Sequence, residues 1–141
     1  MPILSTDILF KQSGASNLGG TVSATNVSTA LHGLFDAVSG AESLAGDIEY
    51  RCIYAKNNHG SLTLYNAVVF IQTNTPSAST DIAIGVGTSA INGTEQTVAN
   101  ESTAPSGVSF SAPSTYATGL ALGDLPAGGT KAIWLRRTVS A

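Results

Sequence analysis

Short runs rich in Val, Ile, Tyr, Phe and Thr recur along the chain between clusters of Gly, Pro, Asn and Ser. Runs of this length and composition are typical of antiparallel strands separated by turns. We therefore predict an all-β fold, an antiparallel β-sandwich of immunoglobulin-like or jelly-roll kind. The predicted strands comprise residues 3–11, 47–57, 61–73, 81–87, 107–113 and 130–139.

The run at residues 47–57 alternates with the period of two that gives a strand its two faces. Cys52 and Tyr54 share one face, which we expect to be the buried one. Asp47 and Glu49 share the other face, where we expect two solvent-facing acids at the start of the strand.

Glycine and asparagine mark the predicted turns and one close approach. Residues 56–61, "KNNHGS", predict a hairpin connection, and Asn92-Gly93 is the strongest short turn signal in the chain. In residues 81–87 large and small apolar side chains alternate, so one face is rich in glycine. Such a face suggests that another backbone approaches it closely.

The first forty residues give a weaker pattern. Leu31, Leu34, Phe35 and Val38 follow helical spacing, so we allow at most one short helix here, or an apolar loop that plugs an end of the sandwich. We expect a single domain overall, with a strand and an extended arm in residues 1–30 and the β-sandwich in residues 31–141.

The arm, residues 13–29, is too small and polar to bury itself. We expect it to become ordered on a neighbouring subunit, with Ser13, Asn17 and Leu18 as candidate interface residues.

Composition narrows the classes of partner. Charged residues make up only 11% of the 141 residues and the formal net charge is −3, so nothing favours nucleic acid or an anionic membrane as a partner. No apolar run is long enough to span a bilayer. Cys52 is the only cysteine, which excludes an intrachain disulfide and fits synthesis in a cytosol.

The sequence offers no convincing catalytic constellation. His32 and His59 are the only histidines, and neither lies at a metal-ligand spacing from Cys52 or an acid, so we interpret both as polar loop residues. Cys52 lies mid-strand, where a thiol behaves as a small apolar group. We therefore predict no catalytic residues, no cofactor and no metal ligands.

The run at residues 130–139 carries the only Trp and an arginine doublet. Alternation places Trp134 and Arg136 on the face opposite Arg137. An exposed Trp beside an Arg is a pairing enriched at protein interfaces, so Trp134 and Arg136 are candidate interface residues. The alternative is simple sheet packing.

Several stretches together resemble a known family. "LFDAVSGAESLAGDIEYRCIYAKN", "LYNAVVFI" and "LALGDLPAGGTKAIWLRRTV" are similar to capsid decoration, or cement, proteins of tailed bacteriophages. This resemblance implies a non-enzymatic virion protein, made in the host cytoplasm, that lies on the capsid exterior and bridges subunits of the major capsid protein. It also implies a homo-oligomer, with a trimer favoured and a dimer possible.

Two other function classes remain open. One is a carbohydrate-binding or adhesin-like sandwich of a phage tail appendage, although such modules cluster exposed aromatics and Tyr65, Tyr116 and Trp134 are dispersed in the sequence. The other is an enzyme with an unrecognised site, which the scarcity of His, Cys and paired acids disfavours.

Overall fold

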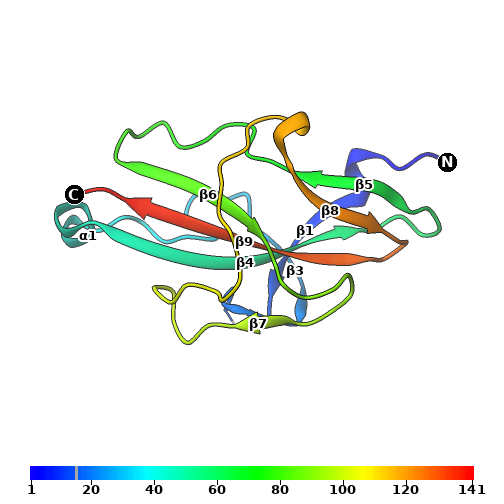
Figure 1. Ribbon diagram of the computed structural model, residues 1–141, viewed down its shortest axis with the longest axis horizontal. Helices are drawn as coiled ribbons and strands as arrows, with labels where there is room; N and C mark the ends of the chain where they lie inside the picture. Colours follow the sequence, from blue (N-terminus) through cyan, green and yellow to red (C-terminus); the bar gives the residue numbers. More distant parts are fainter. Residues whose placement is uncertain (15) are drawn as a thin grey trace.

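A computed structural model describes residues 1–14 and 16–141 (Figure 1). Strands make up 41% of the chain and helices 9%, so the predicted all-β sandwich with little helix is confirmed. One antiparallel sheet has the order β3-β1-β4-β9-β6, and two smaller sheets pair β2 with β7 and β5 with β8. The strands are β1 Ile8–Ser13, β2 Gly19–Gly20, β3 Val22–Asn26, β4 Asp47–Asn57, β5 Leu64–Val69, β6 Thr80–Val86, β7 Glu95–Thr97, β8 Leu120–Leu125 and β9 Thr130–Val139.

The two longest strands, β4 and β9, form the centre of the main sheet. They pair without a break from Asp47 opposite Val139 to Lys56 opposite Thr130. The bounds of both strands agree with the predicted runs, because β-branched and aromatic side chains suit a pleated sheet packed on its faces. Of the other predicted strands, β1 and β5 are shorter than expected, whereas β6 keeps the expected length and begins one residue earlier. Residues 107–113 contribute only an isolated bridge between Ser111 and Ile84.

The main sheet is buried on both faces, not on one. Ile53, Ile84 and Ile133 belong to a core cluster on one face, which the β5–β8 sheet covers. Tyr54 and Trp134 belong to a second cluster on the other face. The expectation of one core face and one solvent face was therefore wrong for the central strands. Glu49, predicted to face solvent, is only 1% exposed.

A close approach to the glycine face of β6 is confirmed. A Cβ atom built on Gly85 would lie 2.5 Å from Val108 Cγ1 and 2.6 Å from the backbone oxygen of Ser109. Only glycine leaves room for this crossing segment, which forms the bridge from Ser111 to Ile84.

The helix lies later in the chain than the spacing of Leu34 and Phe35 predicted. Residues 28–39 form turns and bends, and α1, Gly40–Ala45, follows them. Ser39 caps α1, because its Oγ accepts a hydrogen bond from Glu42 N while the Glu42 carboxylate accepts one from Ser39 N. A loop forms at residues 28–39, in which Leu34 packs against the first core cluster whereas Leu31 and Val38 are exposed. Two short 3-10 turns, η1 Ser5–Asp7 and η2 Tyr116–Thr118, complete the elements.

Within the first thirty residues the predicted strand forms as β1, and much of the predicted arm is paired: β3 belongs to the main sheet and β2 pairs with β7. β1 lies between β3 and β4, and β3 pairs back onto β1. The predicted arm also includes residue 15, which lies outside the described residues.

Of the predicted turns, the one at Asn92 is confirmed: Gly93 N donates to Ala90 O, and Asn92 adopts a φ of 62°. The hairpin predicted at residues 56–61 was wrong. β4 and β5, which this segment joins, lie in different sheets, so the segment crosses from one layer to the other.

Candidate functional site

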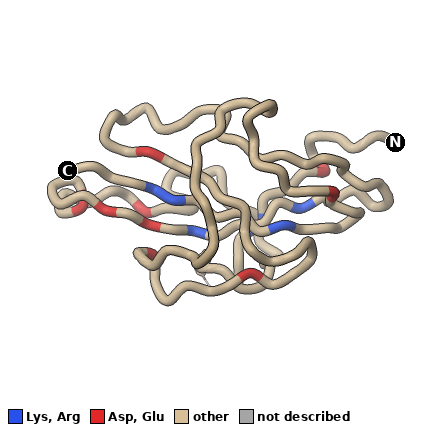
Figure 2. Tube along the Cα trace, in the orientation of Figure 1, with Lys and Arg blue, Asp and Glu red and all other residues tan. Residues whose placement is uncertain are grey.

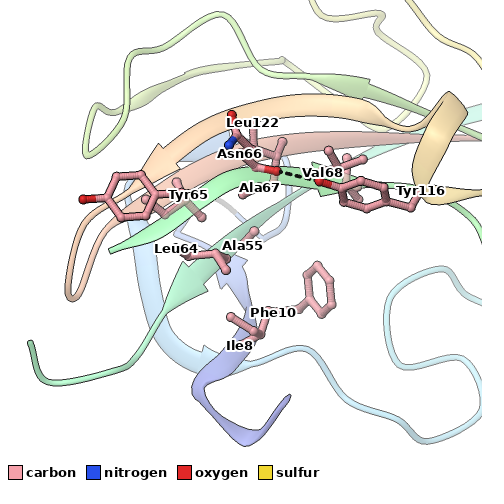
Figure 3. A pocket seen from close by; sticks show the side chains of 12 residues that line it. Ile8, Phe10, Ala55, Leu64, Tyr65, Asn66, Ala67, Val68, Tyr116 and Leu122 are labelled. Carbon is pink, nitrogen blue, oxygen red and sulfur yellow. Dashed lines mark hydrogen bonds between the residues drawn. The ribbon is translucent and has the colours of Figure 1, made fainter. Parts of the chain in front are cut away.

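An apolar groove runs along β5 on the outer side of the first core cluster (Figure 3). We call it the β5 groove. Its volume is about 260 Å³, and no charged residue lines it. The lining comprises the whole of β5, residues 64–69, together with Ile8 and Phe10 of β1, Ala55 of β4, Tyr116 of η2, and Leu122 and Leu125 of β8.

Aromatic side chains at the rim of the β5 groove are exposed to solvent. Tyr65 is 69% exposed, Tyr116 63% and Phe10 45%. Tyr65 and Tyr116 lie towards opposite ends of β5, and Phe10 lies on the β1 side (Figure 3). Large aromatic surfaces in contact with water are a feature of binding sites more than of structural surfaces.

One edge of β5 has no strand partner within the described part of the chain, because its sheet contains only β5 and β8. The strand is also irregular. Its pairing with β8 shifts between Leu64 and Ala67, and Asn66 adopts a φ of 51° while its N–H donates to Asp124 Oδ1 at 2.8 Å. An unpaired strand edge presents free backbone donors and acceptors beside the groove.

A second apolar groove, which we call the loop groove, lies between the segment 27–34 and the segment 69–71, above the main sheet. Its volume is about 370 Å³ and its lining also contains no charged residue. Phe10 and Val69 line both grooves, so the two form one apolar surface. Phe70, in the loop groove, is 36% exposed.

Buried charges near the C-terminal end of β9 hold the loop over the sheet, and Figure 2 shows basic and acidic residues side by side there. Arg137 donates to the Glu49 carboxylate, directly opposite on β4, and to the backbone oxygen of Asp36 at 2.5 Å. Arg51 donates to the backbone oxygen of Leu34 at 3.2 Å. The ring of Phe35 lies 5.0 Å from the Arg137 guanidinium and 5.2 Å from that of Arg51. These contacts anchor the loop that forms one wall of the loop groove.

Three carboxylates in this region, those of Asp36, Glu42 and Glu49, have oxygens within 4.8 Å of one another. Such oxygens could in principle be ligands of a hard cation. Arg137 already pairs with Asp36 and with Glu49, however. Burial raises the pKa of Glu49, although the hydrogen bonds from Arg137 act in the opposite direction. We interpret the cluster as a structural ion-pair network.

Two buried titratable groups lie in and beside the second core cluster: Cys52 belongs to it, and Glu95 N donates to the hydroxyl of its Tyr54. Burial raises the pKa of the Cys52 thiol to about 12, which makes it a poor nucleophile near neutral pH. Burial also opposes ionisation of Glu95, but hydrogen bonds from Ser89 and Thr88 prevail and lower its pKa to about 2. His59, expected in a polar loop, accepts backbone hydrogen bonds through Nδ1 from Ser61 and Leu62, within the segment that joins β4 to β5.

The structure separates the two interface candidates of β9. Trp134 is 0% exposed and packs in the second core cluster, so the expectation that it faces solvent was wrong. Trp134 is buried because other segments of the chain cover this face of the sheet. Arg136 is partly buried, with its guanidinium 5.2 Å from the ring of Phe110. A contact of Arg136 with another protein stays a prediction.

The other candidates, Ser13, Asn17 and Leu18, make contacts within their own chain. Ser13 is buried and its Oγ accepts from Gly19 N at 3.2 Å. The backbone oxygen of Asn17 accepts from Cys52 N at 2.6 Å, and that of Leu18 accepts from Val98 N at 2.9 Å. These groups bond within their own chain, so residues 13, 17 and 18 are not part of a free arm, and their contact with a neighbouring subunit stays a prediction.

The β5 groove was not predicted from the sequence. Tyr65 and Tyr116 are dispersed along the chain, but η2 brings Tyr116 to the side of β5, where its hydroxyl lies 3.5 Å from the backbone oxygen of Asn66. The sequence signal for this groove was the run of residues 64–70. Both faces of this run carry apolar side chains, which is more apolar surface than a strand with one buried face needs.

Comparison of the chain with protein-family models, with curated proteins and with solved structures finds no match. Among the described residues, no helix is both long and apolar enough to cross a membrane.

Proposed function

We propose that this chain is a non-enzymatic virion structural protein that decorates a phage capsid and stabilises it by bridging subunits of the major capsid protein. The observation that carries the proposal is the uncharged apolar surface formed by the β5 groove and the loop groove, with Phe10 and Phe70 exposed on it. Exposed apolar surface of this kind on a compact sandwich is a feature of proteins that act by contact with other proteins.

The low charge of the surface supports the proposed contacts with the repeated subunits of a capsid lattice. Only 11% of the residues are charged, so burying the surface requires little desolvation of ions. A capsid repeats each contact many times, and a protein that touches two subunits gains effective affinity from the second contact. Modest apolar contacts are then sufficient for stable decoration.

The first test is the number of copies of this chain in purified phage particles, measured by quantitative mass spectrometry against the major capsid protein. A ratio comparable to that of the capsid protein is the expected result. A few copies per particle would place the chain in the tail or neck, and its absence would end the virion proposal.

A second test asks whether the apolar surface makes the contact. Phe70→Ser removes an aromatic of the loop groove, and Leu44→Ser removes a leucine of α1 that is 83% exposed and lies outside both grooves. Particles stripped of the protein should bind the Phe70→Ser chain at least about tenfold more weakly than wild type, as for an interface hot spot. The Leu44→Ser chain should bind as wild type does.

A carbohydrate-binding function is a second candidate, because the structure places Tyr65, Asn66 and Tyr116 around one groove. Exposed tyrosine rings can stack on sugars and the Asn66 side chain can bond to hydroxyls. The floor of the groove is aliphatic, however, which suits a peptide better than a polyhydroxylated ligand. Binding on a glycan array that Tyr65→Ala and Tyr116→Ala abolish would favour this candidate over the first.

A further inference from the structure

An exposed apolar segment precedes the first turn of the chain. Residues 1–4 lie outside any helix or strand, and Leu4 has extended backbone angles of φ −103° and ψ 164°. Met1 is 98% exposed and Leu4 52%. With Pro2 and Ile3 the segment contains no charged side chain. We call it the leading segment.

The leading segment leaves the body beside the β5 groove. It is joined through η1 to Ile8, which lines that groove. Figure 1 shows the N-terminus at the right of the molecule, projecting outward beyond β5. The Leu4 backbone is fixed by Asp7, whose N–H donates to Leu4 O and whose carboxylate accepts from Leu4 N. The segment is therefore held outward, not folded into its own groove.

The groove and the leading segment match in chemistry. The groove offers an uncharged apolar floor and an unpaired edge of β5, and the segment offers uncharged apolar side chains on an extended backbone. An extended peptide binds such a site by lying along the strand edge, with its side chains in the pockets beside it. Pro2 lacks an N–H, which suits the first position of a short edge strand.

We propose that the β5 groove is occupied by the leading segment of a second copy of this chain, in a two-fold symmetric dimer. Segment and groove lie on the same patch, so a two-fold axis through that patch brings each segment to the groove of the other copy. The weak net charge of −3 offers little repulsion between copies. The proposal concerns the free protein, and a capsid subunit that contacts the β5 groove would displace the segment from it.

The test is sedimentation equilibrium of the full chain over a range of concentrations, without phage particles. Wild type should show a monomer–dimer equilibrium. Ile3→Ser/Leu4→Ser should raise the dimer dissociation constant at least about tenfold, because two side chains lose their apolar contacts with the groove. Leu44→Ser, on the exposed α1 helix, is the matched control and should leave the dissociation constant unchanged.

A groove variant completes the design. Phe10→Ser should weaken the dimer similarly, and a mixture of this variant with Ile3→Ser/Leu4→Ser should recover heterodimers, since one intact segment then meets one intact groove. Because Phe10→Ser could perturb folding, hydrogen exchange on wild type provides a separate measure: amides of β5 should gain protection as the concentration rises. A chain that stays monomeric, a dimer indifferent to residues 3 and 4, or a species of three copies would overturn the proposal.

Discussion

Glu95 shows how one buried residue can be stabilised without an opposite charge. It is 2% exposed, its N–H donates to the Tyr54 hydroxyl at 3.0 Å, and its carboxylate accepts from Thr88 and from Ser89 N at 2.9 Å. Backbone and hydroxyl donors that favour the ionised form lower the pKa of a carboxyl group. The Glu95 carboxylate thus ties the loop after β6 to the strand β7.

This arrangement predicts acid sensitivity. The pKa of Glu95 is lowered from 4.5 to about 2 in the folded chain, so its contribution to stability is complete above about pH 4.5 and is lost as the pH falls towards 2. Glu95→Gln should lower the free energy of unfolding at neutral pH by about 1–3 kcal/mol. Denaturant titrations at a series of pH values should show a flatter acid profile for the variant. An unchanged acid profile would refute this role for Glu95.

At the scale of elements, Glu49 of β4 and Arg137 of β9 lie directly opposite each other in the strand pairing and form an ion pair. Both residues are nearly buried, at 1% and 6% exposed. A buried pair of this kind gives little net stability over an apolar pair, but the loss of one partner leaves an uncompensated charge. The same Arg137 also holds the loop over the sheet through Asp36.

Substitutions in this pair should therefore be strongly coupled. Glu49→Ala should destabilise the chain by about 3–5 kcal/mol, because Arg137 loses its buried carboxylate partner and keeps only the exposed carboxylate of Asp36. The double variant Glu49→Leu/Arg137→Met should recover a large part of that loss. Thermal and chemical unfolding of Glu49→Leu, Arg137→Met and the double variant measures the coupling, and single effects that add up to the double effect would contradict it.

The sequence predicted elements better than it predicted faces. Residues 47–57 and 130–139 form β4 and β9 with the expected bounds, because their pattern is long and β-rich. Trp134 lies on the predicted face, but that face is covered and not exposed, because alternation says which side chains share a face and not what covers it. The β5 groove depends on Tyr116, a residue distant in sequence, and no local pattern contains that contact.

At the scale of the molecule, the N-terminal third is part of the sandwich. Asn17 bonds to Cys52 at the centre of β4, and β3 forms one edge of the main sheet. The Tyr54 hydroxyl also donates to the backbone oxygen of Gly20 at 2.5 Å. These contacts cover the second core cluster, so its stability depends on residues that the composition alone suggested were a loose arm.

Deletion of residues 13–29 tests this dependence. The deletion removes β2 and β3, uncovers the face that carries Cys52 and Tyr54, and leaves backbone groups of β1 and β4 without partners. We expect loss of the cooperative thermal transition, followed by circular dichroism, and reaction of Cys52 with a thiol reagent under native conditions. A native-like transition with an unreactive Cys52 would mean that the sandwich folds without residues 13–29.

The position of β9 also affects how the protein can be made. This strand lies between β4 and β6, yet it is the last of the strands to be synthesised. Until residues 130–139 have left the ribosome, β4 and β6 have apolar side chains and unpaired edges but no central partner. A chain whose synthesis stops before that point would be prone to aggregation, so residues 130–139 must emerge before the sheet can close.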